Sequence, residues 1–433
     1  MFENQKTFSP LFLILFLYNF LASIYLLISS PVFIYKMVKY KKYRAGLRTR
    51  LGKTDLSDWA KDKKIIWIHA VSVGETKAAS PLIKSLKKKY PDYKILVSTV
   101  TDTGQAVAKS LEGVDWTTYL PLDLIFITRK VAKAVKPKMC LIMETEIWPS
   151  WIWTMSELGI PTYLINGRIS DKSFPNYKKF KWFFKYVFPA VTGFGMQSET
   201  DGEKIKQIGV PPEKIKVLGN LKFDSALVDS NITKDQIREK FGITQDRTII
   251  VGGSTFPGEE KILLDWVVEA RKRFENLLLF LVPRHPERWP EVVKLLESYN
   301  DIKWSKRSEP NLKKEVSVIL LDTMGELSTL YGAAGITFIG KSLVSRGGQN
   351  PLEPAAWGNA ICFGPYMDNF RDIAGSLKEV GGAIEVSDST GLYELLDRWI
   401  ANKEEADEVG HNALKWLHSQ AGVSSRIIEW IKL

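Results

Sequence analysis

The chain has 433 residues, of which 45% are hydrophobic and 25% are charged, and its formal net charge is +11. One hydrophobic core rarely organises more than about 250–300 residues, so the length predicts two domains. The ordinary balance of apolar and charged residues favours neither a mainly disordered chain nor a polytopic membrane protein. Most of the chain is therefore expected to be globular.

The first predicted element is an apolar helix from Leu11 to Val38, in which no charged residue occurs before Lys36. About 20 such residues are enough to cross a bilayer. A cleaved signal peptide is disfavoured because Glu3 and Lys6 precede the apolar stretch, whereas the basic cluster follows it. The sequence therefore predicts a membrane anchor that is retained.

A basic cluster follows the apolar stretch and sets the expected orientation. Its members are Lys36, Lys39, Lys41, Lys42, Arg44, Arg48, Arg50 and Lys53. Such a cluster can bind nucleic acid or an anionic membrane, and the preceding apolar segment favours the membrane. Basic residues beside a membrane segment tend to stay cytoplasmic, which places the globular part on the cytoplasmic side. The candidate interfacial anchors are Tyr18, Tyr25, Tyr35 and Tyr40.

The anchor has a second interpretation, which is a helix that lies in the membrane interface. Asn19, Ser23 and the break at Ser29, Ser30 and Pro31 weaken the apolar stretch. Amphipathic interfacial helices tolerate such polar residues. Both interpretations leave the globular part at the inner leaflet.

Short β-rich segments alternate with helical segments in two series after the anchor. The first series has strands at 65–73, 94–100, 116–122, 139–146, 161–167 and 191–198, with a helix from about Thr76 to Tyr90. A connector with helical content begins near Asn220, and the second series has strands at 248–255, 277–284, 316–322, 336–342 and 360–365 before helices in 391–433. The predicted fold class is α/β, with two doubly wound domains facing a cleft. In such sheets ligands bind beyond the carboxyl ends of the strands.

The two cysteines, Cys140 and Cys362, each lie within an apolar run. We expect both to be small core residues, because they are too few and too far apart for a disulfide framework. Their scarcity fits a reducing compartment. No zinc-binding pattern occurs, so no metal is predicted.

Candidate functional residues follow the first strands. Glu75 follows Gly74, which is expected to allow a tight turn, and it begins a helix. Its carboxylate has the chemistry of a general base. The alternative is a first-turn residue that complements the helix dipole, worth ~0.3–1 kcal/mol. Glu144 and Glu146 leave another strand, and strand alternation predicts that they point to the same side, with Glu146 the stronger candidate.

The second half of the chain has candidate anion-binding segments. Gly253 and Ser254 form a candidate phosphate loop, although no complete dinucleotide fingerprint or Walker lysine accompanies them. The loop at 283–288 combines two prolines with basic side chains, as a phosphate clamp requires. The segment 322–327 is partly similar to a capping box. The glycine-rich segment 342–354 is expected to enter a helix that holds an anion, with Pro351 in the first turn and Glu353 near ribose hydroxyls.

In this order, the motifs HAVSVGE, ETEIWP, NGRIS, GNLKFD, PRHPER, DTMGEL and GGQNPLEPA resemble the bacterial 3-deoxy-D-manno-octulosonic acid (Kdo) transferases. The resemblance extends from the anchor to about Gly364. It implies the GT-B fold, with residues 1–50 as anchor, 51–222 as acceptor domain and 223–433 as donor domain. Gln349 and Trp357 depart from the family pattern, and neither corresponds to a site residue.

The resemblance also implies the reaction and the site. The donor would be CMP-Kdo, the acceptor a hydroxyl of the lipid A precursor, and the anomeric linkage would be inverted. The implied proton acceptor is Glu75, and the implied transition-state stabilisers are Glu146 and Lys222. The implied CMP contacts are Pro283, Arg284, Met324, Gly325, Glu326, Asn350, Pro351, Leu352 and Glu353. No Asp-x-Asp motif occurs, so neither a metal nor another cofactor is predicted.

Two alternatives remain open on sequence grounds. The chain could be another GT-B transferase that uses a UDP-sugar on a lipid acceptor, or a membrane-tethered sensor that binds a sugar nucleotide without transferring it. The predicted localisation is the bacterial inner membrane, with the globular domains on the cytoplasmic side. The number of Kdo residues added and the oligomeric state do not follow from the sequence.

Overall fold

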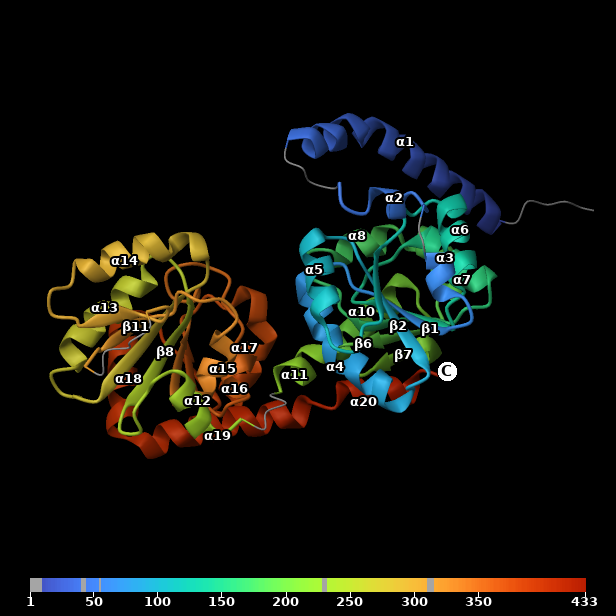
Figure 1. The fold of residues 1–433 in the computed structure, drawn as a ribbon. Helices are drawn as coiled ribbons and strands as arrows, with labels where there is room; N and C mark the ends of the chain where they lie inside the picture. The colour runs from blue at the N-terminus through green and yellow to red at the C-terminus, as the bar shows by residue number, and fades with distance from the viewer. Residues whose placement is uncertain (1–9, 40–43, 54–55, 228–231, 310–314) are drawn as a thin grey trace, which may run out of the picture. The chain divides into compact units, whose positions relative to one another are not determined.

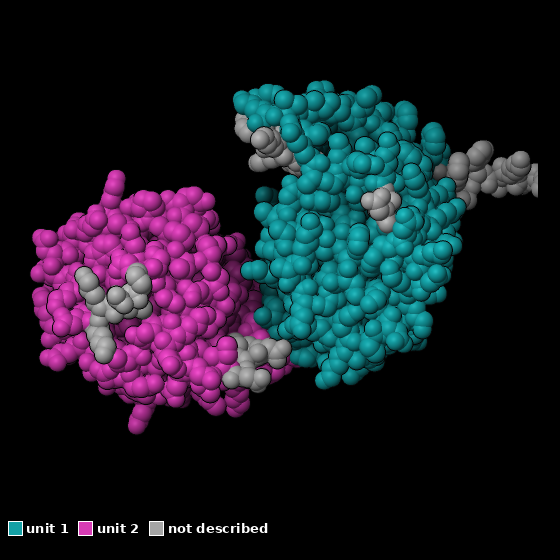
Figure 2. All heavy atoms as spheres, in the orientation of Figure 1, with its two compact units in different colours: residues 1–225, 422–433 teal, residues 226–421 magenta. Residues whose placement is uncertain are grey.

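The computed structural model describes residues 10–39, 44–53, 56–227, 232–309 and 315–433. The chain divides into two compact units, which are residues 1–225 with 422–433, and residues 226–421 (Figure 1; Figure 2). Each unit contains one seven-stranded sheet in which all neighbouring strands are parallel. Helices connect most of the successive strands, so the prediction of two doubly wound α/β domains is confirmed.

The sheet of unit 1 has the strand order β3-β2-β1-β4-β5-β6-β7. Its strands are β1 Lys64–His69, β2 Tyr93–Thr99, β3 Trp116–Tyr119, β4 Met139–Met143, β5 Thr162–Gly167, β6 Gly193–Met196 and β7 Ile215–Val217. Side chains of β1 alternate between two cores: Ile65 and Trp67 pack on one face of the sheet, and Ile66 and Ile68 on the other. A strand covered on both faces is continuously apolar, as the sequence of β1 is.

The helices of unit 1 are α1 Pro10–Lys39, α2 Leu47–Arg50, α3 Leu56–Ala60, α4 Val73–Lys89, α5 Asp102–Ser110, α6 Ile125–Val135, α7 Pro149–Glu157, α8 Phe174–Lys179, α9 Lys181–Val187, α10 Glu199–Ile208, α11 Leu221–Ala226 and α20 Val423–Trp430, of which α11 ends at the unit boundary. Helix α20 (red) packs against α4 (blue) although the two are far apart in sequence (Figure 1).

The sheet of unit 2 has the order β10-β11-β9-β8-β12-β13-β14. Its strands are β8 Thr248–Thr255, β9 Leu277–Pro283, β10 Trp304–Lys306, β11 Val318–Leu320, β12 Ile336–Ile339, β13 Ala360–Phe363 and β14 Ala383–Glu385. Its helices are α12 Lys234–Lys240, α13 Glu259–Ala270, α14 Trp289–Glu297, α15 Leu327–Leu330, α16 Leu352–Ala355, α17 Arg371–Glu379, α18 Ser389–Ala401 and α19 Lys403–Gln420. Both cysteines are buried and free, as expected.

The sequence-based domain boundary needs a correction at the C-terminus. Residues 422–433 belong to unit 1 and not to the second domain. The side chain of Asp224 accepts hydrogen bonds from the backbone N–H groups of Gly422, Val423 and Ser424 at 2.7, 3.1 and 2.7 Å, which caps α20. Trp430 then packs edge-on against Tyr163 of β5, with ring centroids 5.0 Å apart. These contacts join the end of the chain to the first sheet.

The predicted apolar segment forms a single helix, α1. Residues Leu13–Lys39 are long and apolar enough to cross a membrane, with a mean hydropathy of 2.0. Most of the large side chains along the helix are exposed, including Phe16, Leu27 and Ile28. The helix is thus consistent with membrane association. The predicted roles of Glu3, Lys6, Tyr40, Lys41 and Lys42 concern residues outside the described ranges.

Candidate active site

The candidate site of unit 1 lies where the strand order of the sheet reverses, between β1 and β4. Strand β1 ends at His69, and α4 begins at Val73. The expectation of a strand up to Val73 is therefore wrong. Ser72 is the N-cap of α4, and its hydroxyl oxygen accepts the N–H of Glu75 at 3.5 Å, so the chain turns into the helix earlier than expected.

Glu75 is held in a fixed position in the first turn of α4. Its Oε2 accepts the backbone N–H of Val71 at 2.8 Å, and its Oε1 accepts the hydroxyl of Ser72 at 2.8 Å. This arrangement is similar to a capping box. Glu75 also lies in the first turn of α4, where the helix-dipole alternative placed it. Only 8% of the residue is exposed.

The environment of Glu75 raises the pKa of its carboxyl group to about 7. Burial is the main cause, because it disfavours the charged form. The two hydrogen bonds oppose this effect, and the charges of Glu144 and Glu146 add to it. A carboxyl group with a pKa near neutral pH is suited to accept a proton during a reaction.

Gly74 does not have the role that the sequence suggested. It lies within α4 and its φ is not positive, so the backbone does not require glycine there. A Cβ atom at this position would have Ser72 Oγ as its nearest neighbour, at 3.9 Å. The turn before the helix depends instead on the capping side chain of Ser72.

Glu144 and Glu146 lie beyond the end of β4, which stops at Met143. The strand-alternation argument for these two residues is therefore wrong. Glu144 has a φ of +54°, which is unusual for a residue other than glycine. Its N–H still donates to Ile165 O of β5 at 2.9 Å, so this turn is fixed to the sheet. Burial and the charge of Glu144 raise the pKa of Glu146.

A chain of amide side chains positions the start of α11, where Lys222 lies. Asn166 Oδ1 accepts the N–H of Leu221 at 2.8 Å, and Gln197 Nε2 donates to Asn166 O at 2.9 Å. Asn220 Nδ2 donates to Gln197 Oε1, and Asn220 Oδ1 accepts the N–H of Lys222, both at 2.9 Å. Asn166, Gln197 and Asn220 were not predicted as site residues, although the motifs NGRIS and GNLKFD contain two of them.

In unit 2, the strand order reverses between β8 and β12, and predicted residues lie at the carboxyl ends of β8 and β9. Gly253 and Ser254 belong to β8, where Ser254 has a φ of +56° and interrupts the register with β9. A Cβ atom at Gly253 would lie 2.2 Å from Tyr331 Oη, so only glycine fits.

The predicted clamp begins at Pro283, which ends β9. The backbone N–H of Arg284 donates to Thr255 O at 3.1 Å, whereas the side chain of Arg284 is exposed. The structure thus brings the phosphate loop and the predicted clamp together.

The predicted segment 324–326 follows β11, the strand next to β9. Met324 is 68% exposed, and Gly325 has a φ of +82°. Glu326 pairs with Arg307 at 3.5 Å and accepts a short hydrogen bond from the hydroxyl of Thr323. The expected capping box is absent, because Thr323 does not bond the backbone of α15 and Glu326 is itself the N-cap.

The glycine-rich segment leads into α16, which has only one turn. Pro351 is its N-cap and not its first helical residue. Asn350 Oδ1 accepts the N–H of Leu352 at 3.1 Å, and Asn350 Nδ2 donates to Glu353 Oε1 at 3.2 Å. The loop does enter a helix, as expected, but the N–H of Leu352, the first residue of that helix, is already bonded to the side chain of Asn350. Side chains of this segment remain candidates for ligand contact.

Glu259, which the sequence analysis did not identify, connects the loops after β8 and β12. It is 1% exposed and is the first residue of α13. Its Oε2 accepts the N–H groups of Phe256 at 2.9 Å and Lys341 at 2.7 Å, and its Oε1 accepts those of Ser342 at 2.9 Å and Leu343 at 3.1 Å. The signal for this residue was a pair of acidic residues, Glu259 and Glu260, at the start of the helix that follows the glycine-rich end of β8.

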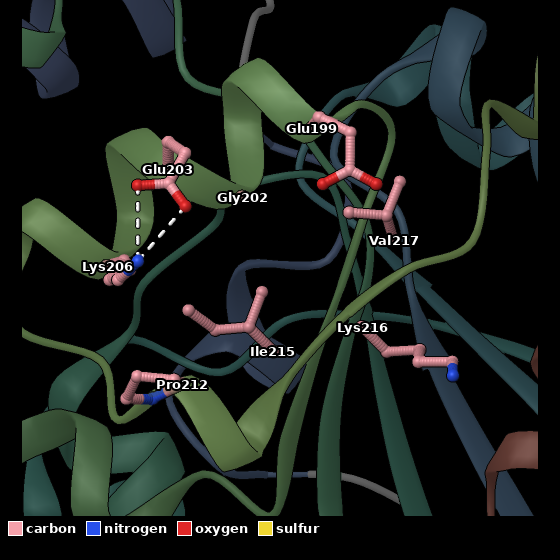
Figure 3. A pocket seen from close by; sticks show the side chains of 8 residues that line it. All are labelled: Glu199, Gly202, Glu203, Lys206, Pro212, Ile215, Lys216 and Val217. Carbon is pink, nitrogen blue, oxygen red and sulfur yellow. Dashed lines mark hydrogen bonds and ion pairs between the residues drawn. The ribbon is translucent and has the colours of Figure 1, made fainter.

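Two further observations concern ligands. Within the described ranges, no group of three or more His, Cys, Asp or Glu side chains is placed to hold a metal ion. A surface pocket lies between α10 and β7, and none of the predicted site residues lines it (Figure 3). Its lining residues are Glu199, Gly202, Glu203, Lys206, Pro212, Ile215, Lys216 and Val217.

Solved structures of an epimerase and of a glycosyltransferase share this fold. A UDP-GlcNAc 2-epimerase from Neisseria meningitidis matches 84% of this chain and 98% of its own, with a TM-score of 0.59 and 14% identity. A glycosyltransferase from Rickettsia africae matches 85% and 97%, with a TM-score of 0.54 and 13% identity. Two seven-stranded parallel sheets, with candidate residues at their carboxyl ends, define a protein of the GT-B class.

Sequence relatives identify the family. Residues 45–225 match the family described as 3-deoxy-D-manno-octulosonic-acid transferase (kdotransferase). The 3-deoxy-D-manno-octulosonic acid transferase of Haemophilus influenzae is 36% identical over 400 residues, which cover 91% of this chain and 92% of the relative. That of Chlamydophila psittaci is 32% identical over 422 residues and 96% of both chains. This chain belongs to the Kdo transferase family, and the predicted resemblance is confirmed.

Proposed function

We propose that this chain transfers Kdo from CMP-Kdo to a hydroxyl group of the lipid A precursor lipid IVA, with inversion at the anomeric carbon and release of CMP. The family and the names of the relatives support Kdo as the transferred sugar. Unit 1 would bind the acceptor and unit 2 the donor. The reaction would take place at the cytoplasmic face of the inner membrane, where α1 holds the enzyme.

Glu75 is the observation that carries this proposal. The acceptor O–H gives its proton to the Glu75 carboxylate while the hydroxyl oxygen forms a bond to the anomeric carbon of Kdo. The bond from that carbon to the phosphate oxygen breaks, and CMP leaves with the electron pair. Glu75 is fixed by two hydrogen bonds, and the pKa of its carboxyl group is about 7, so it is suited to this step.

Unit 2 supplies the groups that would hold CMP-Kdo. The proposed CMP contacts come from the end of β9 and from the segments that follow β11 and β12, and these strands lie in the order β11-β9-β8-β12 in the sheet. They are Pro283, Arg284, Met324, Gly325, Glu326, Asn350, Pro351, Leu352 and Glu353, with Gly253 and Ser254 as the phosphate loop. The exposed guanidinium of Arg284 would neutralise the phosphate charge.

The activity is expected to rise with pH through neutrality. The proton acceptor must be ionised, and the pKa of Glu75 is raised from 4.5 to about 7. Below that value the carboxyl is mostly protonated, so kcat should fall about tenfold for each pH unit lost. A pH profile of kcat, measured between pH 5 and 9, checks this. A profile that is half-maximal near pH 4.5 would contradict the assigned environment of Glu75.

Lys222 and Glu146 are proposed to stabilise the transition state. Replacing Lys222 with Met removes a positive charge and keeps much of the apolar stem of the side chain. We expect kcat to fall about 100-fold, in the range of a lost oxyanion donor. Steady-state kinetics of Lys222→Met check this, with Lys216→Met as a control on the neighbouring strand β7. Equal kcat values for the wild type and Lys222→Met would show that Lys222 does not stabilise the transition state.

A donor panel tests the proposed function as a whole. Purified protein is incubated with lipid IVA and either CMP-Kdo or one of several UDP-sugars, and the released nucleotide is identified by chromatography. Release of CMP from CMP-Kdo alone supports the proposal. Release of UDP would support a different GT-B transferase, and binding of CMP-Kdo without release of CMP would support a sensor.

A further inference from the structure

Lys341 has a backbone conformation that is unusual for its residue type. In the described part of unit 2, Ser254 and Lys341 are the only residues other than glycine with a positive φ, at +56° and +57°. This conformation is strained for a residue with a Cβ atom and favours glycine. Strained residues persist where the surrounding structure holds them, and they are concentrated at functional sites. The strain at Lys341 indicates that a lysine side chain has a use at this position.

The backbone of Lys341 is fixed directly after β12, the strand next to β8 at the point where the strand order reverses. Its N–H donates to Glu259 Oε2 at 2.7 Å, and its carbonyl accepts the N–H of Gly348 at 2.7 Å. Gly340, one residue earlier, lies so close to the phosphate loop that a Cβ atom there would be 2.3 Å from Ser254 O. Lys341 is thus held beside the phosphate loop.

The side chain of Lys341 lies over an aromatic ring that also contacts the predicted clamp. Its Nζ is 4.9 Å from the centroid of the Phe256 ring. The ring of His285, the residue after Arg284, meets the Phe256 ring edge-on, with centroids 5.4 Å apart. Strands β9 and β12 lie on either side of β8, so their ends are ~10 Å apart. Lys341 and Arg284 therefore place two cations on opposite sides of the phosphate loop.

A second hydrogen-bond donor lies beside Lys341 at the glycine-rich segment. Gly347 has a φ of +136°, and a Cβ atom there would lie 3.2 Å from Lys341 Nζ and 3.1 Å from Asn369 Nδ2. The backbone N–H of Asn369 donates to Gly347 O at 2.8 Å, which fixes this arrangement. Asn369 is exposed and Lys341 is partly exposed. An ammonium group and an amide NH₂ group thus lie near one point that a ligand can reach.

The charge of Lys341 is not neutralised within the described ranges, where its side chain forms no ion pair. Asp368, the residue before Asn369, pairs instead with Arg346 and Arg371, both at 3.5 Å. The ammonium group and the amide NH₂ group together match the two acceptor oxygens of a carboxylate. The pair therefore has the chemistry of a carboxylate-binding site.

We propose that Lys341 and Asn369 bind the carboxylate of the donor sugar and thereby select an acidic sugar. This inference rests on the proposed function, in which the donor is CMP-Kdo. The carboxyl group of a 2-ulosonic acid is attached to the anomeric carbon that also carries the phosphate, so the donor presents two anions close together. Arg284 is proposed to neutralise the phosphate, and Lys341 takes the carboxylate. A neutral sugar would leave the ammonium group without a partner, which disfavours its binding.

The first experiment separates binding of the sugar from binding of the nucleotide. Dissociation constants of CMP-Kdo and of CMP are measured by calorimetry, without lipid IVA, for the wild type, Lys341→Gly and Lys341→Met. We expect both variants to bind CMP-Kdo about 10- to 100-fold more weakly and CMP within about twofold of the wild type. Equal losses for the two ligands would place Lys341 at the phosphate, and unchanged binding of CMP-Kdo would exclude Lys341 from the donor site. Either result would overturn the proposal.

The same measurement distinguishes this inference from the proposed function. A wild type that binds CMP-Kdo as weakly as the two variants do overturns the inference alone. A wild type that does not bind CMP-Kdo at all overturns the proposed function together with the inference. Transfer to lipid IVA is not needed for either result, because no acceptor is present.

The glycine variant and a distant lysine control for folding and net charge. A positive φ favours glycine, so Lys341→Gly should be at least as stable in urea denaturation as Lys341→Met. Lys272 lies between α13 and the start of β9 and pairs with Glu269 at 2.7 Å. Lys272→Met removes one positive charge and should bind both ligands as the wild type does. If it weakens CMP-Kdo binding as much as Lys341→Met, the effect is one of net charge and the proposal is wrong.

Asn369→Asp tests the second donor. The new carboxylate would pair with Lys341 and repel the carboxylate of the ligand, so calorimetry should show at least about tenfold weaker binding of CMP-Kdo. The affinity for CMP should again be close to that of the wild type. Wild-type affinity for CMP-Kdo in Asn369→Asp would contradict a carboxylate site formed by these two residues.

Discussion

Replacing Glu75 with Gln is expected to lower kcat about 10²- to 10⁴-fold, the range for loss of a general base. The change keeps the size of the side chain but removes the group that accepts the acceptor proton. The KM for CMP-Kdo should change little, because the residues proposed to bind the donor belong to unit 2. Rates of CMP release at saturating substrate measure the effect.

Glu75 also caps α4, so loss of stability must be separated from loss of catalysis. Asp201 provides a matched control: it is also 8% exposed, and its carboxylate accepts the hydroxyl of the N-cap residue Ser198 at 2.6 Å. Asp201→Asn should lower the free energy of unfolding by about 1 kcal/mol. Glu75→Gln should lower it less, because burial already disfavours the charged carboxylate and the amide is neutral. Only Glu75→Gln should lose activity. Near-wild-type turnover in Glu75→Gln would exclude Glu75 as the base.

The second large effect is expected from Glu259→Gln. One oxygen of Glu259 accepts the N–H groups of Phe256 and Lys341, and the other accepts those of Ser342 and Leu343. An amide NH₂ group in place of either oxygen would face two N–H donors. Two buried donors would then lack acceptors, which costs about 1–3 kcal/mol each. We expect the free energy of unfolding of unit 2 to fall by about 2–5 kcal/mol, as measured by urea denaturation.

The same substitution should weaken donor binding, because the loop after β12 leads to the proposed contacts at 350–353. The KM for CMP-Kdo is therefore expected to rise, whereas the KM for lipid IVA is not. Asp397→Asn is a control in the same unit, since Asp397 accepts the indole N–H of Trp266 at 3.1 Å and pairs with Arg273 at 2.7 Å, and none of these residues belongs to the segments proposed to bind the donor. Asp397→Asn should lose stability without a change in the donor KM. If both variants change the KM for CMP-Kdo equally, Glu259 does not position the loop that leads to the donor contacts.

The longer strands and the class of the fold were predictable from the sequence, because continuously apolar segments such as β4 and β9 are typical of buried parallel strands. Three strands were missed: β7, β10 and β14 have three residues each and lie at sheet edges. So short a segment at an edge has few side chains to bury, and its pattern is indistinguishable from that of a loop.

Within the site, the sequence indicated which residue types follow each strand but not how the turns are built. The turn at Glu144 depends on a positive φ, and the position of Lys222 depends on amide side chains from two other strand ends. The role of Glu259 arises from contact with residues more than 80 positions away in sequence. Side chains that satisfy distant backbone groups leave no periodic pattern, so only the folded structure identifies them.

The assignment of α20 to unit 1 has a similar cause. Apolar positions predicted the helical end of the chain, but helices α19 and α20 differ in the core that they complete. Asp224 of unit 1 caps the first turn of α20, and this contact helps to hold α20 against unit 1. A cap supplied by a residue about 200 positions earlier is not visible in the local sequence.

Mass spectrometry of lipid IVA, after incubation with purified protein and CMP-Kdo, tests the central claim most directly. We predict that the acceptor gains the mass of one or more whole Kdo residues and that Glu75→Gln abolishes the gain on the same time scale. The mass increment also counts the sugars added. An acceptor of unchanged mass, with CMP-Kdo intact and the protein folded, would contradict the assignment of this chain as a Kdo transferase that acts on lipid IVA.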